Sequence, residues 1–236
     1  ASGNTHHETD QKKFGTSSIH FDGTGDYLTV ANHADLQFSG DFTTESWIRY
    51  NGSQGVFFDN RDDGNNNGSF TVYTAGTSQL RLHINGSDVI TSANNVLSAN
   101  TWHHIACTRS SGATKLFVDG VQVGSTWTDS RNISDGFWTF GVDYSHSTSW
   151  DITGYMEDIR FTKGVARYTA DFDVPTLSFP TASLYKNDDY AAQNVLLIQS
   201  NTTDGSTTIE DSSDSGHTIT VIGDTHHETD QKKFGT

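Results

Sequence analysis

The sequence predicts an all-β protein, a two-sheet antiparallel jelly-roll sandwich, on three observations. Short runs rich in β-branched and aromatic residues recur along most of the 236 residues, as they do in proteins built from short strands. Clusters of Gly, Asn and Asp separate these runs, and 22 glycines stand against only 2 prolines, which is typical of turns. No window keeps a 3.6-residue apolar period, so we expect at most one helical turn, within Lys163–Phe172.

The expected strands follow one another along the chain and number eleven or more, which favours a sandwich. They are Ser18–Asp22, Tyr27–Val30, Phe42–Tyr50, Gly55–Asp59, Ser69–Thr74, Gln79–Ile84, Trp102–Arg109, Lys115–Asp119, Val121–Trp127, Trp138–Val142 and Ile152–Thr162. Asp119-Gly120, between two apolar runs, predicts a two-residue hairpin. Val174–Pro180 holds both prolines and is expected to leave the sandwich in an extended conformation.

A perfect internal repeat indicates that the chain belongs to a tandem array. The twelve residues THHETDQKKFGT occur at Thr5–Thr16 and again at Thr225–Thr236, a spacing of 220 residues from position 5 to position 225. This period is longer than that of ordinary solenoid repeats. It fits whole domains strung together, each with its own core.

The repeat divides the chain into five segments. We expect an inter-module linker and repeat start at 1–16, the jelly roll at 17–180, a second linker at 181–194, the entry strands of a module at 195–222, and a repeat of 4–16 at 223–236. The entry segment contains two strand-like pieces, Val195–Gln199 and His217–Ile222. Since domain termini often lie close together, we expect it to fold back onto the same sandwich, with docking on a neighbouring molecule as the alternative.

The composition excludes several classes of function. The formal net charge of −15 argues against nucleic-acid binding, which needs a basic surface, and against anionic membranes. No apolar run approaches the ~18 residues of a membrane span, so no membrane insertion is expected. The single cysteine, Cys107, allows no intrachain disulfide and lies in an apolar run, where a buried, inert thiol is expected.

Four segments occur in a characteristic order: IHFDGTGDYLTV, GDFTTESWIRY, TWHHIACTRSSGATKLFVDGVQV and GYMEDIRFTKGVARYTADF. Together they resemble the laminin-G-like, concanavalin A-like jelly rolls of large bacterial and phage surface proteins, such as adhesins and tail fibres. The segment VLLIQ…TTIEDSSDSGHTITVIGD…KKFGT is similar to the entry segment of the same modules. The resemblance implies carbohydrate-binding modules, protein-binding modules or plain spacers, many of them with a structural calcium ion.

Aromatic residues between positions 127 and 150 are the best candidates for a sugar platform, because sugars stack on flat rings while polar neighbours bond their hydroxyls. Trp138 alternates with Phe140 and is expected in the core. Trp127 and Trp150 lie beside turn-rich sequence and are the better candidates. With them, one rim of the sandwich is expected to present Arg61, Asp143, Tyr144 and His146.

Two groups of oxygen-bearing residues are candidates for calcium, which takes six to eight oxygen ligands. The first is the loop DNRDDGNNN, with Asp59, Asp62, Asp63, Asn65, Asn66 and Asn67; the alternative is a turn that binds nothing. The second follows from the resemblance, in which one calcium clamps the domain ends: the pair Asp22 and Asp158, with Asp26 as a weaker third. The alternatives are a turn cap for Asp22 and a solvent-facing strand residue for Asp158.

Neither zinc nor catalysis is expected. His6-His7 and His103-His104 are histidine pairs, but a zinc site needs three or four converging ligands and no others are identifiable. Laminarinase-type hydrolases of the same superfamily carry E-x-D-x-x-E. Glu8 and Glu228 begin E-T-D, but a lysine stands at the place of the third acid in both copies.

The sequence therefore predicts a non-catalytic, repeated module of a giant extracellular, cell-surface or virion-surface protein. We expect it to bind glycan through loops at one rim, with calcium as a possible cofactor. The alternative is a structural extender that has no ligand and is stiffened by calcium. The expected partners are carbohydrate and neighbouring copies of the same module, with no nucleic acid.

Overall fold

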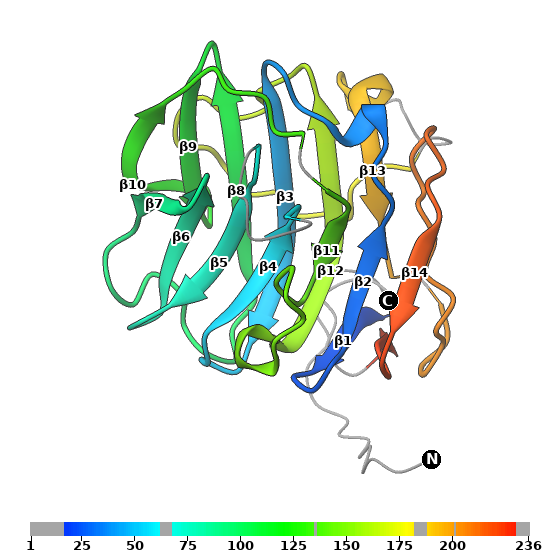
Figure 1. Cartoon of the computed structure of the whole chain (residues 1–236). Coiled ribbons are helices and arrows are strands. Elements are labelled where there is room, and N and C mark those ends of the chain that lie inside the picture. Colours follow the sequence, from blue (N-terminus) through cyan, green and yellow to red (C-terminus); the bar gives the residue numbers. More distant parts are fainter. Residues whose placement is uncertain (1–16, 62–67, 135, 182–187, 201, 230–236) are drawn as a thin grey trace.

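The computed structural model describes residues 17–61, 68–134, 136–181, 188–200 and 202–229. Within these ranges two antiparallel sheets pack face to face (Figure 1), which confirms the predicted jelly-roll sandwich. The eight-stranded sheet has the order β10 (Val121–Thr128), β9 (Ala113–Val118), β8 (His103–Ser110), β3 (Phe42–Tyr50), β12 (Thr153–Lys163), β1 (Ser18–Asp22) and β15 (His226–Glu228), with β13 (Asn194–Ile198) also paired to β12.

The seven-stranded sheet faces the viewer in Figure 1. Its order is β14 (Ile219–Ile222), β2 (Tyr27–Val30), β11 (Trp138–Phe140), β4 (Gly55–Asp59), β5 (Thr71–Ala75), β6 (Gln79–Ile84) and β7 (Ser87–Thr91). Three short 3-10 helices are described, η1 (Ala34–Leu36), η2 (Thr148–Trp150) and η4 (Ala191–Gln193). No helix of the described residues is long and apolar enough to cross a membrane.

The core lies between the sheets and is dense in aromatic rings. Phe161 of β12 contacts Trp138 of the opposite sheet with ring centroids 4.6 Å apart and Phe58 at 5.8 Å. All three side chains are at most 1% exposed, and rings at such angles add to the free energy of area burial. Trp138 and Phe140 are buried in this core, as their alternation predicted. Cys107 is buried as well, and burial raises the pKa of its thiol.

The hairpin predicted at Asp119-Gly120 joins β9 to β10. Both residues have positive φ angles, 49° and 81°, as the two-residue turn that suits twisted strands requires. The pairing of Val118 with Val121 directly beside the turn sets the register of the hairpin. A side chain at position 120 would also meet the carbonyl oxygen of Phe172, because a Cβ there would lie 2.0 Å from it.

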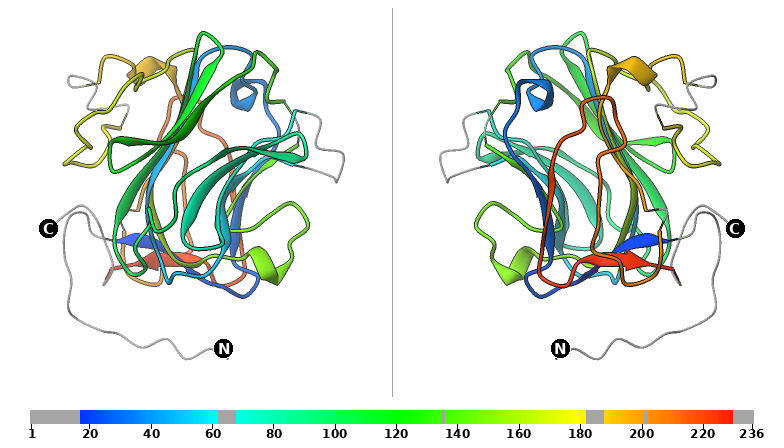
Figure 2. Two further views of the ribbon diagram at one scale, coloured as in Figure 1. Left: turned by 90° about the vertical axis from the view of Figure 1, so that its left-hand side faces the viewer. Right: turned by 90° about the vertical axis from the view of Figure 1, so that its right-hand side faces the viewer.

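The last strands of the chain complete both sheets. β13 pairs with β12, β14 with β2, and β15 with β1, so strands from both ends of the chain lie side by side (Figure 2). Leu196 and Ile198 of β13 are fully buried in the common core. The hydroxyl of Ser200 bonds that of Ser17 at 2.7 Å and also contacts the ring of His227.

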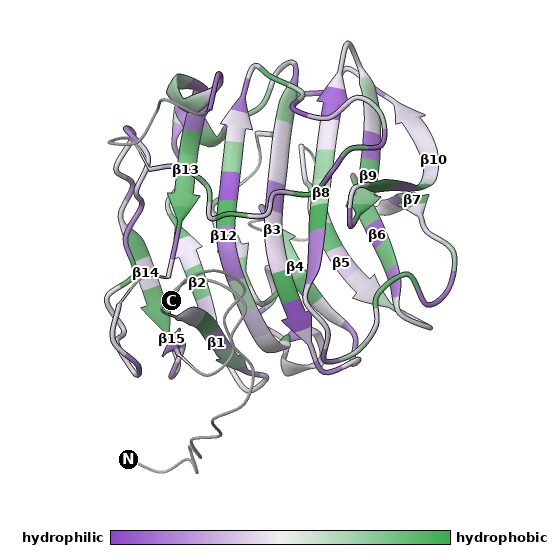
Figure 3. Ribbon diagram, turned by 180° about the vertical axis from the view of Figure 1, so that it is seen from behind, coloured by the Kyte–Doolittle hydropathy of each residue, from purple (hydrophilic) through white to green (hydrophobic). Residues whose placement is uncertain are grey.

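Residues 164–181 cross the outer face of the eight-stranded sheet as an irregular strap (Figure 3). The helical turn predicted within Lys163–Phe172 is wrong, because β12 continues to Lys163 and the residues after it have no helical structure. The strap is instead hydrogen-bonded to the sheet. The hydroxyl of Thr43 donates to the carbonyl oxygen of Val165, and the hydroxyl of Thr108 donates to the carbonyl oxygen of Tyr168.

Two strands were not predicted from the sequence. β7 follows the turn Asn85-Gly86 and is mostly exposed, so it has no clear apolar alternation. β15 reads His-His-Glu and has no apolar residue at all. Its place in the sheet comes from pairing with β1, in which His226 lies opposite His20 and Glu228 opposite Ser18.

Candidate ligand-binding site

The outer face of the seven-stranded sheet carries two hollows. In β6, Leu80 and Leu82 point into the core, so Arg81 and His83 point outward; in β5, Val72 points inward and Tyr73 outward. The first hollow is lined by Val56, Arg61, Thr71, Tyr73, His83, Asp143 and Trp150. The second is lined by Tyr27, Thr29, Ala31, Asn32, Gly136, Phe137, His146 and Thr220.

An ion pair fixes the polar side of the first hollow. Arg61 donates Nε to Asp59 Oδ1 at 2.9 Å and Nη2 to Oδ2 at 2.7 Å, a bidentate geometry that also holds the guanidinium plane. Asp59 is fully buried at the end of β4 and also accepts from Thr71 Oγ1 and from the backbone N–H of Tyr144, each at 2.9 Å. Asp143 Oδ2 faces the Arg61 Nη2 atom at 3.9 Å.

Two aromatic rings also line the hollow. Tyr73 of β5 and Trp150 of η2 meet edge to face, with centroids 5.6 Å apart and an angle of 79° between the rings. The guanidinium of Arg61 lies over the ring of Tyr144, 4.6 Å from its centroid. The hollow thus combines ring surfaces with carboxylate, guanidinium and imidazole groups, a composition that suits a ligand with apolar faces and hydroxyl groups.

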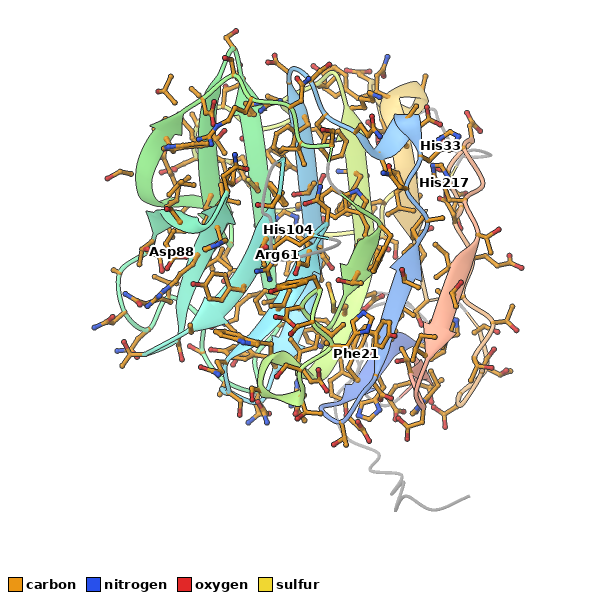
Figure 4. All side chains as sticks on the ribbon, in the orientation of Figure 1. Phe21, His33, Arg61, Asp88, His104 and His217 are labelled. Carbon is orange, nitrogen blue, oxygen red and sulfur yellow. The ribbon has the colours of Figure 1, made fainter. Side chains whose placement is uncertain are left out.

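Asp88 of β7 organises the part of this face toward β7 (Figure 4). It accepts a hydrogen bond from the Tyr73 hydroxyl at 2.8 Å and one from Arg81 Nη1 at 3.0 Å, and the Nδ1 atom of His83 lies 3.0 Å away. Burial raises the pKa of Asp88, but the bonds from His83, Tyr73 and Arg81 outweigh it and hold the pKa below its ordinary value. Asp88 therefore orients two of the side chains that line the hollow.

A cluster of three carboxylates lies where the end of the chain meets the start of the sandwich. Oxygens of Asp22, Asp26 and Asp224 all lie within 4.8 Å of one another. Asp26 is buried and accepts backbone N–H bonds from Asp22 at 2.9 Å and from Asp224 at 2.6 Å. Burial and then the neighbouring Asp224 carboxyl raise the pKa of Asp26 to about 7. Oxygen ligands of this kind could hold a hard cation such as calcium.

Comparison with known proteins places the sandwich in a family. The laminin-G-type sequence profile of the concanavalin A-like lectin/glucanase superfamily matches residues 22–167, well over half of the chain. This chain belongs to the concanavalin A-like lectin/glucanase superfamily. The match includes every strand of the seven-stranded sheet except β14. No curated protein sequence matches the chain.

Solved structures share the superfamily fold at low sequence identity. A candidate carbohydrate-binding protein from Bacteroides ovatus has a TM-score of 0.61 and 18% identity, with 91% of this chain and 60% of that protein covered. This chain therefore spans 60% of that protein's length. A weaker likeness is to domains LG4–5 of the mouse laminin α1 chain, with a TM-score of 0.49 and 16% identity over 62% of this chain and 41% of that one. Another is to domain 4 of an extracellular arabinanase from Geobacillus stearothermophilus, solved with arabinotriose, with a TM-score of 0.45 and 17% identity over 61% of this chain and 69% of that one.

Within the superfamily sandwich, the predicted ligand residues do not form one rim. Arg61, Asp143 and Trp150 line the first hollow, and Tyr144 lies against Arg61. His146 belongs to the second hollow, where its ring stacks on Tyr27 at 4.6 Å. Trp127 lies on β10 of the other sheet, beneath the guanidinium of Arg131, and lines neither hollow.

Sequence reasoning missed the sheet residues of the first hollow. Tyr73 and His83 lie on strands that were predicted with nearly the observed bounds. Because strand side chains alternate between faces, the runs TVYT and QLRLHI already place Tyr73, Arg81 and His83 on one outward face. That alternation is the signal in the sequence that identifies these residues.

The predicted metal residues are also dispersed. Asp59 is held by Arg61, Thr71 and Tyr144, while Asp62, Asp63, Asn65, Asn66 and Asn67 lie outside the described residues. Asp22 lies opposite Thr153 at the start of β12, whereas Asp158 lies five residues further along β12, so the structure does not bring the pair together. Asp22 meets Asp26 and Asp224 instead.

Asp158 is not the solvent-facing residue offered as its alternative. It is buried at a bulge in β12 and accepts hydrogen bonds from Phe179 N and Gln199 Nε2, each at 2.8 Å. Burial raises the pKa of Asp158 to about 6. These hydrogen bonds hold the strap and the residue after β13 against the sheet, so Asp158 stabilises the fold.

A buried ionic network lies on the opposite side of the sandwich, between the eight-stranded sheet and the strap. Glu45 accepts from Arg160 Nε at 3.0 Å and Nη2 at 2.8 Å, from the Tyr168 hydroxyl at 2.8 Å, and has His104 Nε2 at 3.1 Å. Burial raises the pKa of Glu45, but Arg160, His104 and Arg167 outweigh it and lower the pKa to about 2. The strap covers these groups, so they stabilise the fold and do not form an open site.

Proposed function

We propose that this chain is a non-catalytic, glycan-binding module, and that a sugar ring occupies the first hollow on the outer face of the seven-stranded sheet. The observation that carries the proposal is the meeting of Tyr73 and Trp150 beside Arg61 and Asp143. Sugars present an apolar C–H face and a rim of hydroxyls, and this hollow has a group for each.

The side chains have separate tasks in this proposal. Trp150 stacks on the apolar face of the sugar, and the ring of Tyr73, at 79° to that of Trp150, borders the edge of the sugar. Asp143 accepts hydroxyl hydrogens through Oδ2, since its Oδ1 already accepts from the backbone N–H and the hydroxyl of Ser145. Arg61 donates to ring or hydroxyl oxygens from a guanidinium that Asp59 holds in place, so little side-chain entropy is lost on binding.

Binding without hydrolysis fits the acids on this face. Glycosidases use two carboxyl groups placed about 5–9 Å apart across the scissile bond, one of them free to give up a proton. Here Asp59 is saturated by Arg61, Thr71 and Tyr144, and Asp88 is bound by Tyr73, Arg81 and His83. These bonds leave both carboxylates engaged with protein groups.

The repeat supports a place for the module in a larger array. Twelve identical residues 220 positions apart, from 5 to 225, are expected of consecutive copies, and many weak sites on one chain bind a glycan surface with high avidity. We infer a giant extracellular protein, at a cell or virion surface, with neighbouring copies of the module as its partners. The B. ovatus protein, a candidate carbohydrate-binding protein, is consistent with this inference.

Calcium is part of the proposal at one place, the cluster of Asp22, Asp26 and Asp224. Three carboxylates this close repel one another, and the raised pKa of Asp26 means that a proton relieves the repulsion when no cation does. Calcium would neutralise the same charge through oxygen ligands and would join Asp224, near the end of the chain, to the β1–β2 turn. In this role it stiffens the module and does not touch the sugar.

A glycan array probed with the whole chain, in calcium and again in EDTA, tests the proposed function. We expect selective hits that persist in EDTA, because the first hollow lies apart from the carboxylate cluster. Hits that vanish in EDTA would mean that the glycan binds at the calcium ion and not in the first hollow. Silence on the whole array, together with a melting temperature that rises with calcium, would favour the alternative of a stiffened spacer without a ligand.

A further inference from the structure

We propose that His33, Asp35 and His217 form a binding site for a first-row divalent transition metal of the zinc type, which fastens the edge strand β14 to the body of the sandwich. One ligand atom from each of the three side chains lies within 4.8 Å of the other two. Figure 4 shows His33 and His217 side by side at the end of the sheet where β2 and β14 meet. The site is separate from the proposed sugar hollow and from the carboxylate cluster.

The strand register explains why residues so far apart in sequence meet. β14 pairs with β2, and Ile219 lies opposite Val30 at the end of the ladder. His217 comes two residues before Ile219, and His33 three residues after Val30, so both histidines lie just beyond the last pair. Their rings meet edge to face, with centroids 4.8 Å apart.

The backbone holds the ligands in place before any metal arrives. Asp211 accepts the backbone N–H of His217 at 2.8 Å through one oxygen and that of Leu197 at 2.9 Å through the other. Asp35 lies in η1. Its backbone N–H donates to His33 Nδ1 at 3.2 Å, and its carboxylate Oδ2 lies 3.2 Å from the same nitrogen. Ligands held in this way lose little freedom on binding a metal.

One polar atom in this group lacks a partner of its own. The Nε2 atom of His217 is buried from solvent and makes no hydrogen bond within the described residues. A buried ring nitrogen without a partner costs free energy that a metal ion would recover. His33 and Asp35 are 55% and 43% exposed in their side chains, so an ion can reach the group from solvent.

The donor set selects the kind of metal. Two imidazole nitrogens and one carboxylate oxygen suit zinc, copper, nickel or cobalt, whereas calcium and magnesium prefer oxygen ligands alone. Three protein ligands leave a fourth position for water in a tetrahedral site. A bound ion would add a link between the loop after β2 and the segment that precedes β14, and so would resist the opening of an edge strand.

The test is zinc binding to the whole chain after treatment with EDTA, measured by calorimetry and by the melting temperature. We expect zinc to bind at this site and to raise the melting temperature. Calcium at the same concentration should not compete with zinc for this site. His217→Ala, His33→Ala and Asp35→Asn should each weaken this binding at least about tenfold, since even partners outside the metal's ligand set are worth about 10–100-fold. His83→Ala removes a histidine elsewhere and should leave it unchanged.

The repeated His-His pairs could also bind zinc, so the position of the site needs its own readout. Electron paramagnetic resonance of the chain loaded with one equivalent of Cu²⁺ should show coupling to two imidazole nitrogens, reduced to one in His33→Ala and in His217→Ala. The same melting shift in wild type, His33→Ala and His217→Ala would overturn the proposal. So would a wild-type chain that binds no zinc, or a copper spectrum that neither substitution alters.

Discussion

The ring of Trp150 meets the ring of Tyr73 edge to face, 5.6 Å away between centroids and at an angle of 79°. Tyr73 comes from the sheet and Trp150 from a short 3-10 helix in the loop after β11. Asp59 anchors the same loop, because its carboxylate accepts the backbone N–H of Tyr144 at 2.9 Å. The first hollow thus exists because one buried carboxylate fixes both Arg61 and the loop that brings Trp150 to the sheet.

Replacing Trp150 by alanine should remove one wall of the hollow. Because a stacked ring is the main apolar contact available to a sugar here, we expect Trp150→Ala to weaken binding of an array hit at least about tenfold, or about 1.4 kcal/mol. Trp127→Ala is the matched control, since Trp127 lies on the other sheet. Titration calorimetry gives the comparison, and equal losses in both variants would contradict the position of the site.

The packing of β13 gives a test of how the end of the chain folds. Leu196 is fully buried, whereas Leu177 in the strap is 72% exposed. Leu196→Ala should therefore lower the free energy of unfolding by about 2–5 kcal/mol. Leu177→Ala should change it by less than about 0.5 kcal/mol. Urea unfolding measures both, and a neutral Leu196→Ala would mean that β13 is detached from the core in solution.

Strand prediction succeeded where alternation and turn chemistry agree, as in Gln79–Ile84 and at Asp119-Gly120. It failed for β15, because His226 to Glu228 has no apolar face and becomes a strand only by pairing with β1. The strap was misjudged for a related reason. Tyr168 and Phe172 lie flat on each other, 3.6 Å between centroids, against the eight-stranded sheet, and that contact is tertiary.

The candidate site could be predicted only in part, because it too depends on contacts between residues far apart in the sequence. The residue types of a sugar platform can be recognised in sequence, and Arg61, Asp143 and Trp150 do line one hollow. Which aromatic residue joins them depends on sheet order, and β10 carries Trp127 to the other sheet. Likewise, no local pattern could bring Asp224 to Asp26, or His217 to His33, since both contacts depend on the pairing of β14 with β2.

Glu45 should be highly sensitive to substitution. Its carboxylate is fully buried among Arg160, His104 and Tyr168. Glu45→Gln removes this buried negative charge and leaves Asp188 as the remaining carboxylate beside Arg160. We expect a loss of about 3–5 kcal/mol in the free energy of unfolding. Glu210→Gln changes an exposed residue of the same type and should be near neutral.

The pH dependence of Glu45 follows from its lowered pKa. With a pKa of about 2 in the folded state, the carboxylate stabilises the fold above its ordinary pKa of about 4.3. That contribution is lost as the pH falls from about 4.3 to about 2. Urea unfolding of wild type and Glu45→Gln at pH 6 and pH 3 checks this. A stability difference of equal size at both values would contradict the assignment.

The carboxylate cluster should make stability depend on pH in the opposite sense. The pKa of Asp26 is raised to about 7, so between about pH 4 and pH 7 the folded state keeps a proton that the unfolded chain has lost. The contribution of Asp26 therefore falls as the pH rises through this interval. Burial lowers the pKa values of His20 and His227, which act in the other direction, so the comparison must use a variant.

Asp224→Asn is that variant, and it places at position 224 the residue found at position 4 of the first copy. Removing the neighbouring carboxylate should stabilise the chain relative to wild type more at pH 8 than at pH 5. Calcium should stabilise wild type more at pH 8 than at pH 5, and this effect should shrink in Asp224→Asn. Unfolding at the two pH values, with and without calcium, measures both. If the substitution changed the free energy of unfolding equally at pH 8 and at pH 5, the proposed interaction between Asp26 and Asp224 would be refuted.

The central claim, that a sugar lies against Trp150 on the outer face of the seven-stranded sheet, is tested most directly by indole signals. The chain has five tryptophans, so a ¹⁵N-labelled sample gives five Nε1–H resonances, and Trp150→Ala and Trp127→Ala assign the two that matter. During titration with an array hit, the Trp150 resonance should shift and saturate while that of Trp127 stays in place. A Trp150 resonance that does not move while the glycan binds would contradict the claim.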